Sequence, residues 1–237
     1  AMTLSDTCYQ EMRNLSIKMM RAMGNFAGGC NVQFAQDPYT EELIAIEINP
    51  RVSRSSALAS KATGYPIAKI AAKLAIGYRL DELSNQITNS TSAYFEPALD
   101  YIALKIPRWD LDKFRMVSQE ISSEMKSVGE IMALGRSFEE VMQKGLRMLQ
   151  IGLYGFVANE NLKETIDIEK ELQHPTPRRI LAIAKALHQG WTVEEVSKRT
   201  GIDRWFLGKL KNIVEMKKQM VQNKKEKLFE KSDFLLR

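Results

Sequence analysis

Three polar residues stand at every second position near the end of an apolar run. Glu47, Asn49 and Arg51 alternate with isoleucine and proline in the stretch "IAIEINPR". Successive side chains of a β-strand point to opposite faces, so these three share one face. Carboxylate and amide oxygens bind hard cations such as Mg²⁺, and a guanidinium binds phosphate or carboxylate through two hydrogen bonds. The opposite face, which we expect in the core, carries Ile44, Ile46 and Ile48.

A second apolar run, "NVQFAQ", precedes this one and is separated from it by the turn-forming stretch "DPYTE". The two runs predict a β-hairpin centred near Thr40. Antiparallel pairing then sets Gln33 opposite Glu47 and Asn31 opposite Asn49, with Cβ atoms about 5 Å apart. This geometry suits a metal-bridged phosphate. A polar, solvent-facing strand face would show the same alternation, so the pattern alone leaves both interpretations open.

Helical and strand patterns alternate through the first 150 residues. One predicted helix begins at Ser5 or Asp6 and ends at Gly24, and another has Pro66 at its first position and Gly77 at its exit. The stretch "FEPALDYIALKIPRWD" has strand-like apolar content. These patterns predict a mixed α and β region over residues 1–151.

A capped amphipathic helix is predicted where Ser137 and Glu140 form a capping box in "SFEEVMQKGLRML". After Gly152 the strand patterns disappear, and helical patterns follow with Gly190 and Gly201 between them. We therefore expect an α+β chain of two domains, a mixed one over 1–151 and a helical one over 152–237.

Composition excludes several classes of protein. The 237 residues are 44% hydrophobic and 27% charged, as in ordinary soluble domains. No apolar run reaches the roughly 20 residues of a membrane helix, and no signal-peptide pattern is present, so we expect a cytoplasmic protein without membrane contact. Cys8 and Cys30 are expected as reduced thiols. His174 and His188 lie far from them in sequence, which disfavours a zinc or Cys-His catalytic site.

A nucleic-acid-binding module is the rival interpretation of the helical region. The stretch "TVEEVSKRTGIDRWFLGKLKNIV" has the rhythm of a helix-turn-helix, and the net charge is +5. The second helix would carry the cations Arg204, Lys209 and Lys211. Its apolar residues indicate packing instead, and Glu194 and Glu195 would repel a phosphate backbone. We therefore favour a packed helical domain that does not bind nucleic acid.

The longest motifs resemble the large chain of carbamoyl phosphate synthetase. "NPRVSRSSALASKATGYP" carries the resemblance most specifically, and "FEPALDYIALKIPRWDLDKF", "MKSVGEIMALGRSFEEVMQKGLRML" and "IDRWFL" extend it along the chain. The resemblance implies the C-terminal part of the carboxyphosphate-forming ATP-grasp domain over 1–151. It implies a helical oligomerisation domain, cut short at its C-terminus, over 152–237. Another ATP-grasp carboxylase or ligase is the alternative within this class.

The resemblance also implies roles for individual residues. Gln33, Glu47 and Asn49 would be ligands to Mg²⁺ or Mn²⁺ that bridges the ATP phosphates. Arg51 would contact bicarbonate or carboxyphosphate, and Arg54 would lie near an internal ammonia path. The implied activity is that of an ATP-dependent carbon–nitrogen ligase in pyrimidine or arginine biosynthesis.

The same resemblance implies partners and a limit. The implied partners are ATP, bicarbonate, a glutamine amidotransferase that supplies ammonia, and further copies of the chain. Nothing in the sequence resembles the lysine- and glycine-bearing strands that hold the nucleotide in ATP-grasp enzymes. We therefore expect the chain alone to be inactive.

Overall fold

The computed structural model describes residues 2–159 and 166–235. The chain forms two compact units, residues 1–99 and 100–237. Both contain helices and one small antiparallel sheet, which confirms the mixed fold class. The predicted domain boundary after residue 151 concerns family domains rather than compact units, and it stays a prediction.

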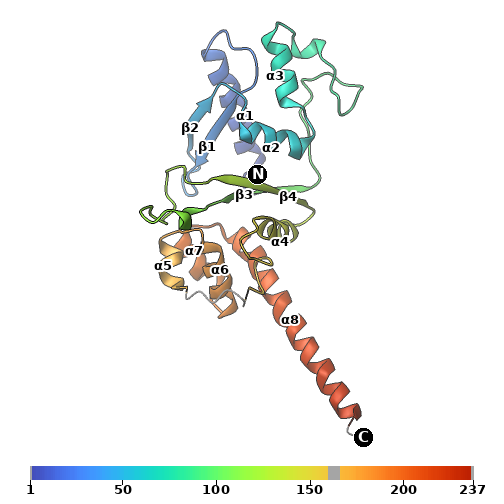
Figure 1. Ribbon diagram of the computed structural model, residues 1–237. Coiled ribbons are helices and arrows are strands. Elements are labelled where there is room, and N and C mark those ends of the chain that lie inside the picture. Colours follow the sequence, from blue (N-terminus) through green and yellow to red (C-terminus); the bar gives the residue numbers. More distant parts are fainter. Residues whose placement is uncertain (1, 160–165, 236–237) are drawn as a thin grey trace. The chain divides into compact units, whose positions relative to one another are not determined.

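In the first unit, one helix precedes the hairpin along the chain and further helices follow it (Figure 1). Its elements are α1 (Asp6–Ala22), β1 (Asn31–Gln36), β2 (Leu43–Asn49), α2 (Arg54–Thr63), α3 (Ile67–Ala75) and the short 3₁₀ helix η1 (Leu80–Glu82). The Ser5 hydroxyl accepts a hydrogen bond from Cys8 N at 3.2 Å, which confirms Ser5 as the cap of α1. Pro66 precedes the first residue of α3 rather than occupying it, a shift of one position from the prediction.

The register of the hairpin confirms the predicted pairs. Asn31 lies opposite Asn49, and Gln33 lies opposite Glu47. The register then shifts, because Phe34 pairs with Ala45 and leaves Ile46 without a partner on β1. This bulge interrupts the strict alternation of side chains beyond the Gln33–Glu47 pair.

The expectation that the isoleucines of β2 lie in the core is wrong for two of them. Ile44 is 54% exposed and Ile46 is 61% exposed, whereas Ile48 is half-buried. The sheet has only two strands, and the bulge turns this part of β2 out of regular alternation. Alternation predicts which residues share a face, but burial also requires a second layer against that face.

The second unit begins with a two-stranded sheet that α4 covers on one face (Figure 1). Its strands are β3 (Ile102–Arg108) and β4 (Gly129–Gly135), connected by a segment that includes the short 3₁₀ helix η2 (Leu111–Lys113), and α4 spans Phe138–Met148. The sequence patterns described above do not predict β4. The predicted cap at Ser137 is present, but Glu140 Oε2 accepts from Arg136 N, at 2.9 Å, rather than from Ser137 N.

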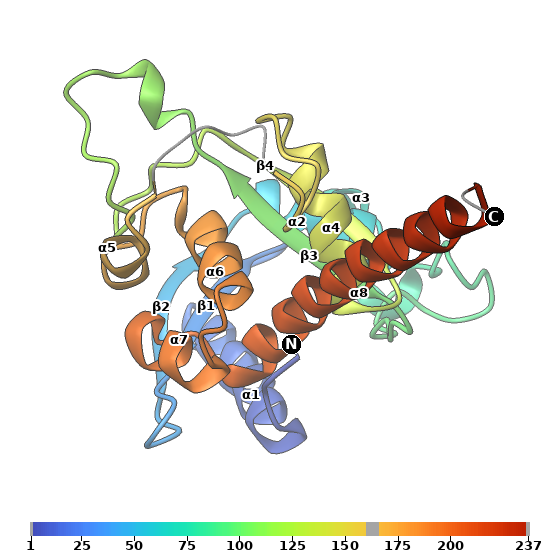
Figure 2. The ribbon, with the colours of Figure 1, turned by 90° about the horizontal axis from the view of Figure 1, so that it is seen from below.

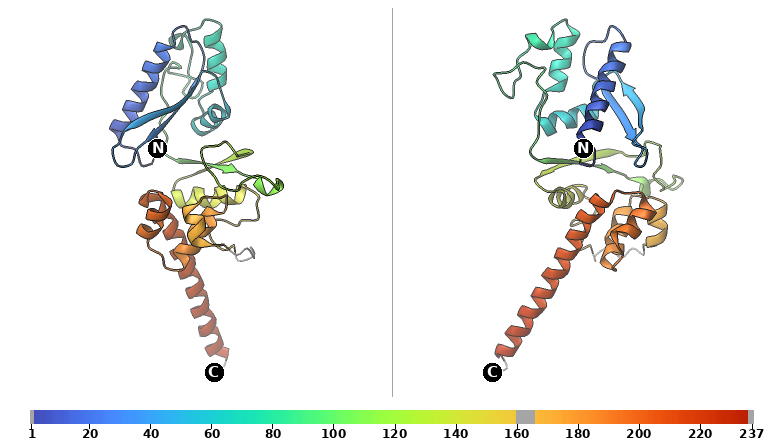
Figure 3. Two further views of the ribbon diagram at one scale, coloured as in Figure 1. Left: turned by 90° about the vertical axis from the view of Figure 1, so that its left-hand side faces the viewer. Right: turned by 180° about the vertical axis from the view of Figure 1, so that it is seen from behind.

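Four more helices follow in the described part of the second unit, and Figure 2 shows α5, α6 and α7 grouped beside the start of α8. They are α5 (Ile168–Gln173), α6 (Arg179–His188), α7 (Val193–Thr200) and α8 (Arg204–Leu235). Thr192 and Glu195 form a capping box at α7, and Gly201 ends that helix in the left-handed conformation with φ 69°. The C-terminal part of α8 extends beyond the other helices of the unit (Figure 3).

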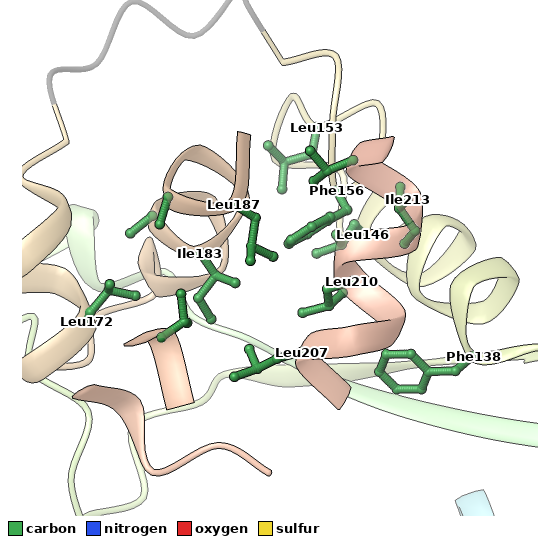
Figure 4. Packing of buried hydrophobic residues seen from close by; sticks show 14 of the residues in the cluster. Phe138, Leu146, Leu153, Phe156, Leu172, Ile183, Leu187, Leu207, Leu210 and Ile213 are labelled. Carbon is green, nitrogen blue, oxygen red and sulfur yellow. The ribbon is translucent and has the colours of Figure 1, made fainter. Parts of the chain in front are cut away.

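The core of the second unit joins α4 to the helices that follow it. Leu146 from α4, Ile183 from α6 and Leu207 from α8 lie in one apolar cluster together with Phe156 (Figure 4). The Phe138 ring lies 5.5 Å from the Trp205 ring, centroid to centroid, in an edge-on arrangement. The sheet-covering helix and the helical bundle therefore share one hydrophobic core.

We expect Leu207→Ala to lower the free energy of unfolding of the second unit by about 2–5 kcal/mol, because it removes a fully buried side chain and leaves a cavity. Urea unfolding followed by circular dichroism measures this. Met220→Ala, on the same helix at a residue that is 67% exposed, is the matched control and should change stability by about 0.5 kcal/mol or less. Equal losses for the two variants would contradict the described core.

Candidate functional site

The β1–β2 hairpin brings the amides of Gln33 and Asn49 onto one carboxylate oxygen. Gln33 Nε2 donates to Glu47 Oε1 at 2.6 Å, and Asn49 Nδ2 donates to the same oxygen at 2.9 Å. Gln33 reaches it across the sheet because it lies opposite Glu47 in the register. Asn49 reaches it along β2, two residues on, where side chains share a face. The predicted cluster is therefore present.

The remaining oxygens of this cluster suit a hard cation. Within the described residues, no hydrogen bond reaches Glu47 Oε2, Gln33 Oε1 or Asn49 Oδ1. Gln33 and Glu47 are exposed and Asn49 is half-buried, so the three oxygens are accessible. Mg²⁺ in nucleotide sites is bound by one or two carboxylates, with phosphate and water oxygens completing the shell. One carboxylate and two amides fit that pattern as a partial set of ligands.

A metal site formed by protein side chains alone is not found in the described part of the chain. Across residues 2–159 and 166–224, whose side chains the structure describes, no group of three or more histidine, cysteine or acidic residues could hold a metal ion. A cation at Glu47 would therefore depend on oxygens from another source, such as phosphate.

Arg51 follows the hairpin cluster at the end of β2. Its backbone N–H donates to Asn49 O at 2.8 Å, which turns the chain directly after the strand. The guanidinium is exposed and makes one long hydrogen bond, from Nη1 to Val52 O at 3.4 Å. Most of its donors are therefore available to an anion.

Arg54 is the first residue of α2, and a capping box sets its position. Ser53 Oγ accepts from Ser56 N at 3.4 Å, while Ser56 Oγ accepts from Ser53 N at 3.1 Å. Ser56 is buried, which anchors the start of the helix, and Arg54 is exposed. Among the described residues no hydrogen bond or ion pair connects Arg54 to Glu47. Arg51 and Arg54 are near Glu47 in the sequence. Among the described residues, however, only the side-chain amides of Gln33 and Asn49 donate hydrogen bonds to the Glu47 carboxylate.

The helix-turn-helix stretch has the expected helices but uses them for packing. Leu207 and Leu210 of α8 are buried in the apolar cluster. Lys209 Nζ lies 3.6 Å from Glu139 Oε1 on α4 and 5.5 Å from the centroid of the Trp205 ring. Lys211 Nζ lies 3.8 Å from Glu215 Oε1 on the same helix. Of the three cations of this helix, Lys209 is thus paired with α4, Lys211 is paired along α8, and Arg204 is exposed.

No helix in the described part of the chain is both long enough and apolar enough to cross a bilayer.

Comparison with protein families gives two matches. Residues 1–83 match the family described as "Carbamoyl-phosphate synthase L chain, ATP binding domain". Residues 130–236 match the family described as "Carbamoyl-phosphate synthetase large chain, oligomerisation domain". The first match contains the whole hairpin cluster with Arg51 and Arg54.

Similar proteins carry names that agree with both matches. The chain is 52% identical over 224 residues, 94% of its length, to a carbamoyl phosphate synthase large chain of Archaeoglobus fulgidus, of which it covers 21%. It is 52% identical over 231 residues, 96% of its length, to a carbamoyl phosphate synthase large chain, N-terminal section, of Methanopyrus kandleri, of which it covers 41%. The chain therefore spans about one to two fifths of the length of these relatives. None of these names supports nucleic-acid binding.

We expect Glu47→Ala to change the free energy of unfolding of the chain by about 1 kcal/mol or less. Its two hydrogen bonds are exposed to water, where each contributes little net stability. Urea unfolding of the parent and the variant measures this. A decrease in the free energy of unfolding above about 2 kcal/mol would show that these side chains stabilise the hairpin, and would contradict a role in ligand binding alone.

Proposed function

Because the chain belongs to the carbamoyl phosphate synthetase large-chain family, we propose that its hairpin forms one wall of the site where ATP phosphorylates bicarbonate. The observation that carries this proposal is the convergence of Gln33 and Asn49 on Glu47 Oε1. It leaves three oxygens for a cation, one from Gln33 on β1 and two from Glu47 and Asn49 on β2, the strand that leads to Arg51. The family match over residues 1–83, an ATP-binding domain, agrees with this use of the hairpin.

In the proposed site, Gln33, Glu47 and Asn49 would hold Mg²⁺ or Mn²⁺ for the ATP phosphates. The bound metal would neutralise negative charge on the transferring phosphoryl group. The protein's own contribution is to hold the three side chains next to one another. The β-sheet register does this for Gln33 and Glu47, and the alternation of β2 does it for Asn49.

Arg51 is proposed to bind bicarbonate and the carboxyphosphate formed from it. A planar guanidinium pairs with a carboxylate-like anion through two parallel hydrogen bonds, which positions the anion for in-line attack on the phosphoryl group. The exposed Arg51 donors support this role. Arg54 is proposed to lie along the path by which ammonia reaches carboxyphosphate. Its place at the start of α2, three residues after Arg51, supports a neighbouring role.

The proposed reaction class is ATP-dependent carbon–nitrogen ligation in the cytoplasm, with ammonia supplied by a glutamine amidotransferase. Another ATP-grasp ligase would use the same metal and ATP groups to activate a different acid, whereas another ATP-grasp carboxylase would also use bicarbonate but would not pass the carboxyl group to ammonia. The names of the relatives favour carbamoyl phosphate synthesis. Bicarbonate dependence therefore separates carbamoyl phosphate synthesis from a ligase that activates another acid, and the use of ammonia as acceptor separates it from another carboxylase.

In a full-length large chain that contains this sequence, we expect Glu47→Ala to lower bicarbonate-dependent ATP hydrolysis about 100-fold or more, because it removes the carboxylate of the metal site. Steady-state phosphate release with and without bicarbonate measures this. Glu42→Ala, at an exposed carboxylate just before β2, is the matched control and should keep its activity. Residues 1–237 alone should hydrolyse ATP only at background rate.

An unchanged rate of bicarbonate-dependent ATP hydrolysis for Glu47→Ala would contradict the proposal that the hairpin forms part of the active site. A bicarbonate-dependent rate for residues 1–237, abolished by Glu47→Ala, would contradict the expected inactivity of the chain alone. ATP hydrolysis by the full-length chain without any need for bicarbonate would favour a different ATP-grasp ligase.

We further propose that the helical region mediates self-association. The match of residues 130–236 to an oligomerisation domain supports this proposal. So does the extension of α8, whose side chains Met216 and Met220 are 63% and 67% exposed. Exposed apolar side chains on an extended helix are typical of surfaces that contact another protein.

Sedimentation velocity of the chain over a wide concentration range, with and without a labelled DNA duplex, tests this assignment. We expect a reversible, concentration-dependent dimer or larger species that ignores the DNA. A monomer at all concentrations would contradict self-association. Co-sedimentation with the duplex, weakening steeply as salt rises, would instead restore the helix-turn-helix interpretation.

A further inference from the structure

The second unit contains a cavity of about 390 Å³ that the proposed function does not use. It lies between β3, α4 and the start of α6, and its wall is largely apolar. The apolar lining includes Leu104, Ile106, Met142, Leu146, Ile180 and Ile183. Leu146 and Ile183 also belong to the core cluster of Figure 4, so that side of the wall is fixed by packing. Its size and lining are those of small-molecule sites in proteins.

The charged residues of the lining are all cations. Lys105, Arg108 and Arg179 line the cavity, and no aspartate or glutamate of the described residues does. Two of these cations already have acidic partners. Lys105 Nζ lies 2.6 Å from Glu130 Oε2, and Arg108 Nε lies 3.2 Å from Asp110 Oδ1.

Arg179 differs because its hydrogen-bond partners in the described structure are neutral backbone oxygens, and the Glu171 carboxylate acts on its charge only from beyond ion-pair distance. Its Nη2 donates to Leu172 O at 2.7 Å and its Nε donates to Glu171 O at 3.3 Å. No carboxylate of the described residues lies within ion-pair distance of it. The nearby Glu171 side chain is occupied by Arg178, at 3.2 Å, and by the Thr176 hydroxyl. Arg179 Nη1 has no hydrogen bond from the chain described.

Arg179 is also partly buried. Partial burial lowers the pKa of Arg179 below its ordinary value, because water no longer solvates the charge fully. An arginine nevertheless stays protonated in proteins, so the guanidinium keeps its charge beside an apolar wall. An anion bound here would be attracted more strongly than one bound at an exposed arginine.

We infer that this cavity binds a small molecule with an apolar body and one carboxylate. The carboxylate would pair with Arg179, and the apolar body would lie against Leu104, Ile106 and Met142. The opposite wall is built in advance, because Ile121 N donates to Pro175 O at 2.7 Å and both residues line the cavity. A preformed apolar cavity lined by one cation that has no ion pair among the described residues selects for this combination of shape and charge.

The test uses residues 1–237 and two probes of nearly the same shape, 4-phenylbutyrate and the uncharged 4-phenylbutyramide. Isothermal titration calorimetry should show one molecule of the acid bound per chain, with an affinity about tenfold or more above that of the amide. Arg179→Gln should remove this difference between the probes. Arg136→Gln, at an exposed arginine of the same unit, is the matched control and should preserve it.

A second variant keeps the test decisive if Arg179→Gln does not fold. Met142→Trp fills the cavity from α4 and should abolish binding of the acid, while circular dichroism reports whether the fold is kept. Equal affinities for the acid and the amide would overturn the proposal. So would acid binding that survives Met142→Trp, or the absence of binding by the parent chain at millimolar probe concentrations.

Discussion

The packing of α4 against two partners at once is the constraint on which the second unit depends. On one side α4 lies so close to the sheet that a Cβ added at Gly145 would come within 2.7 Å of Ile106 Cδ1. On the other side Phe138 contacts Trp205 and Phe206 of α8, with ring centroids 5.5 and 5.4 Å apart. Because α4 packs against both the sheet and α8, it fixes the position of the sheet relative to the helical bundle. This explains why the compact unit starts before β3 rather than at the first of the later helices.

Backbone hydrogen bonding has the corresponding role in the first unit. The antiparallel register places Gln33 opposite Glu47, and that pairing creates the candidate site without help from a buried core. The bulge at Ile46 lies directly next to this pair. It interrupts the regular alternation of side chains between the two faces of β2. Bulges are frequent next to functional sites because they re-aim side chains. A local irregularity and the polar cluster thus occur at the same point in the hairpin.

Sequence reasoning succeeded where local chemistry decides the structure. Turn residues and alternation predicted the Gln33–Glu47 pair, and Ser5 and Ser137 predicted two helix starts. It failed where burial by distant residues decides, as for exposed Ile46 and for β4, whose neighbours in space are β3 and α4. The cavity around Arg179 has the same origin. Its lining spans residues 104 to 202, and no short motif could indicate that these residues meet.

The two arginine environments of this chain imply different kinds of binding. Arg51 is solvated, as are Gln33 and Glu47, and interactions between exposed charges are weakened by water and salt. A hairpin of this kind can orient a metal–phosphate complex but cannot bind it tightly by itself. It therefore requires further contacts, in keeping with a chain that spans a fraction of its relatives. Arg179 has the opposite balance, because its charge is partly desolvated and its apolar wall is already assembled. Strong binding there would need only a ligand of the right shape and charge, and no second protein surface.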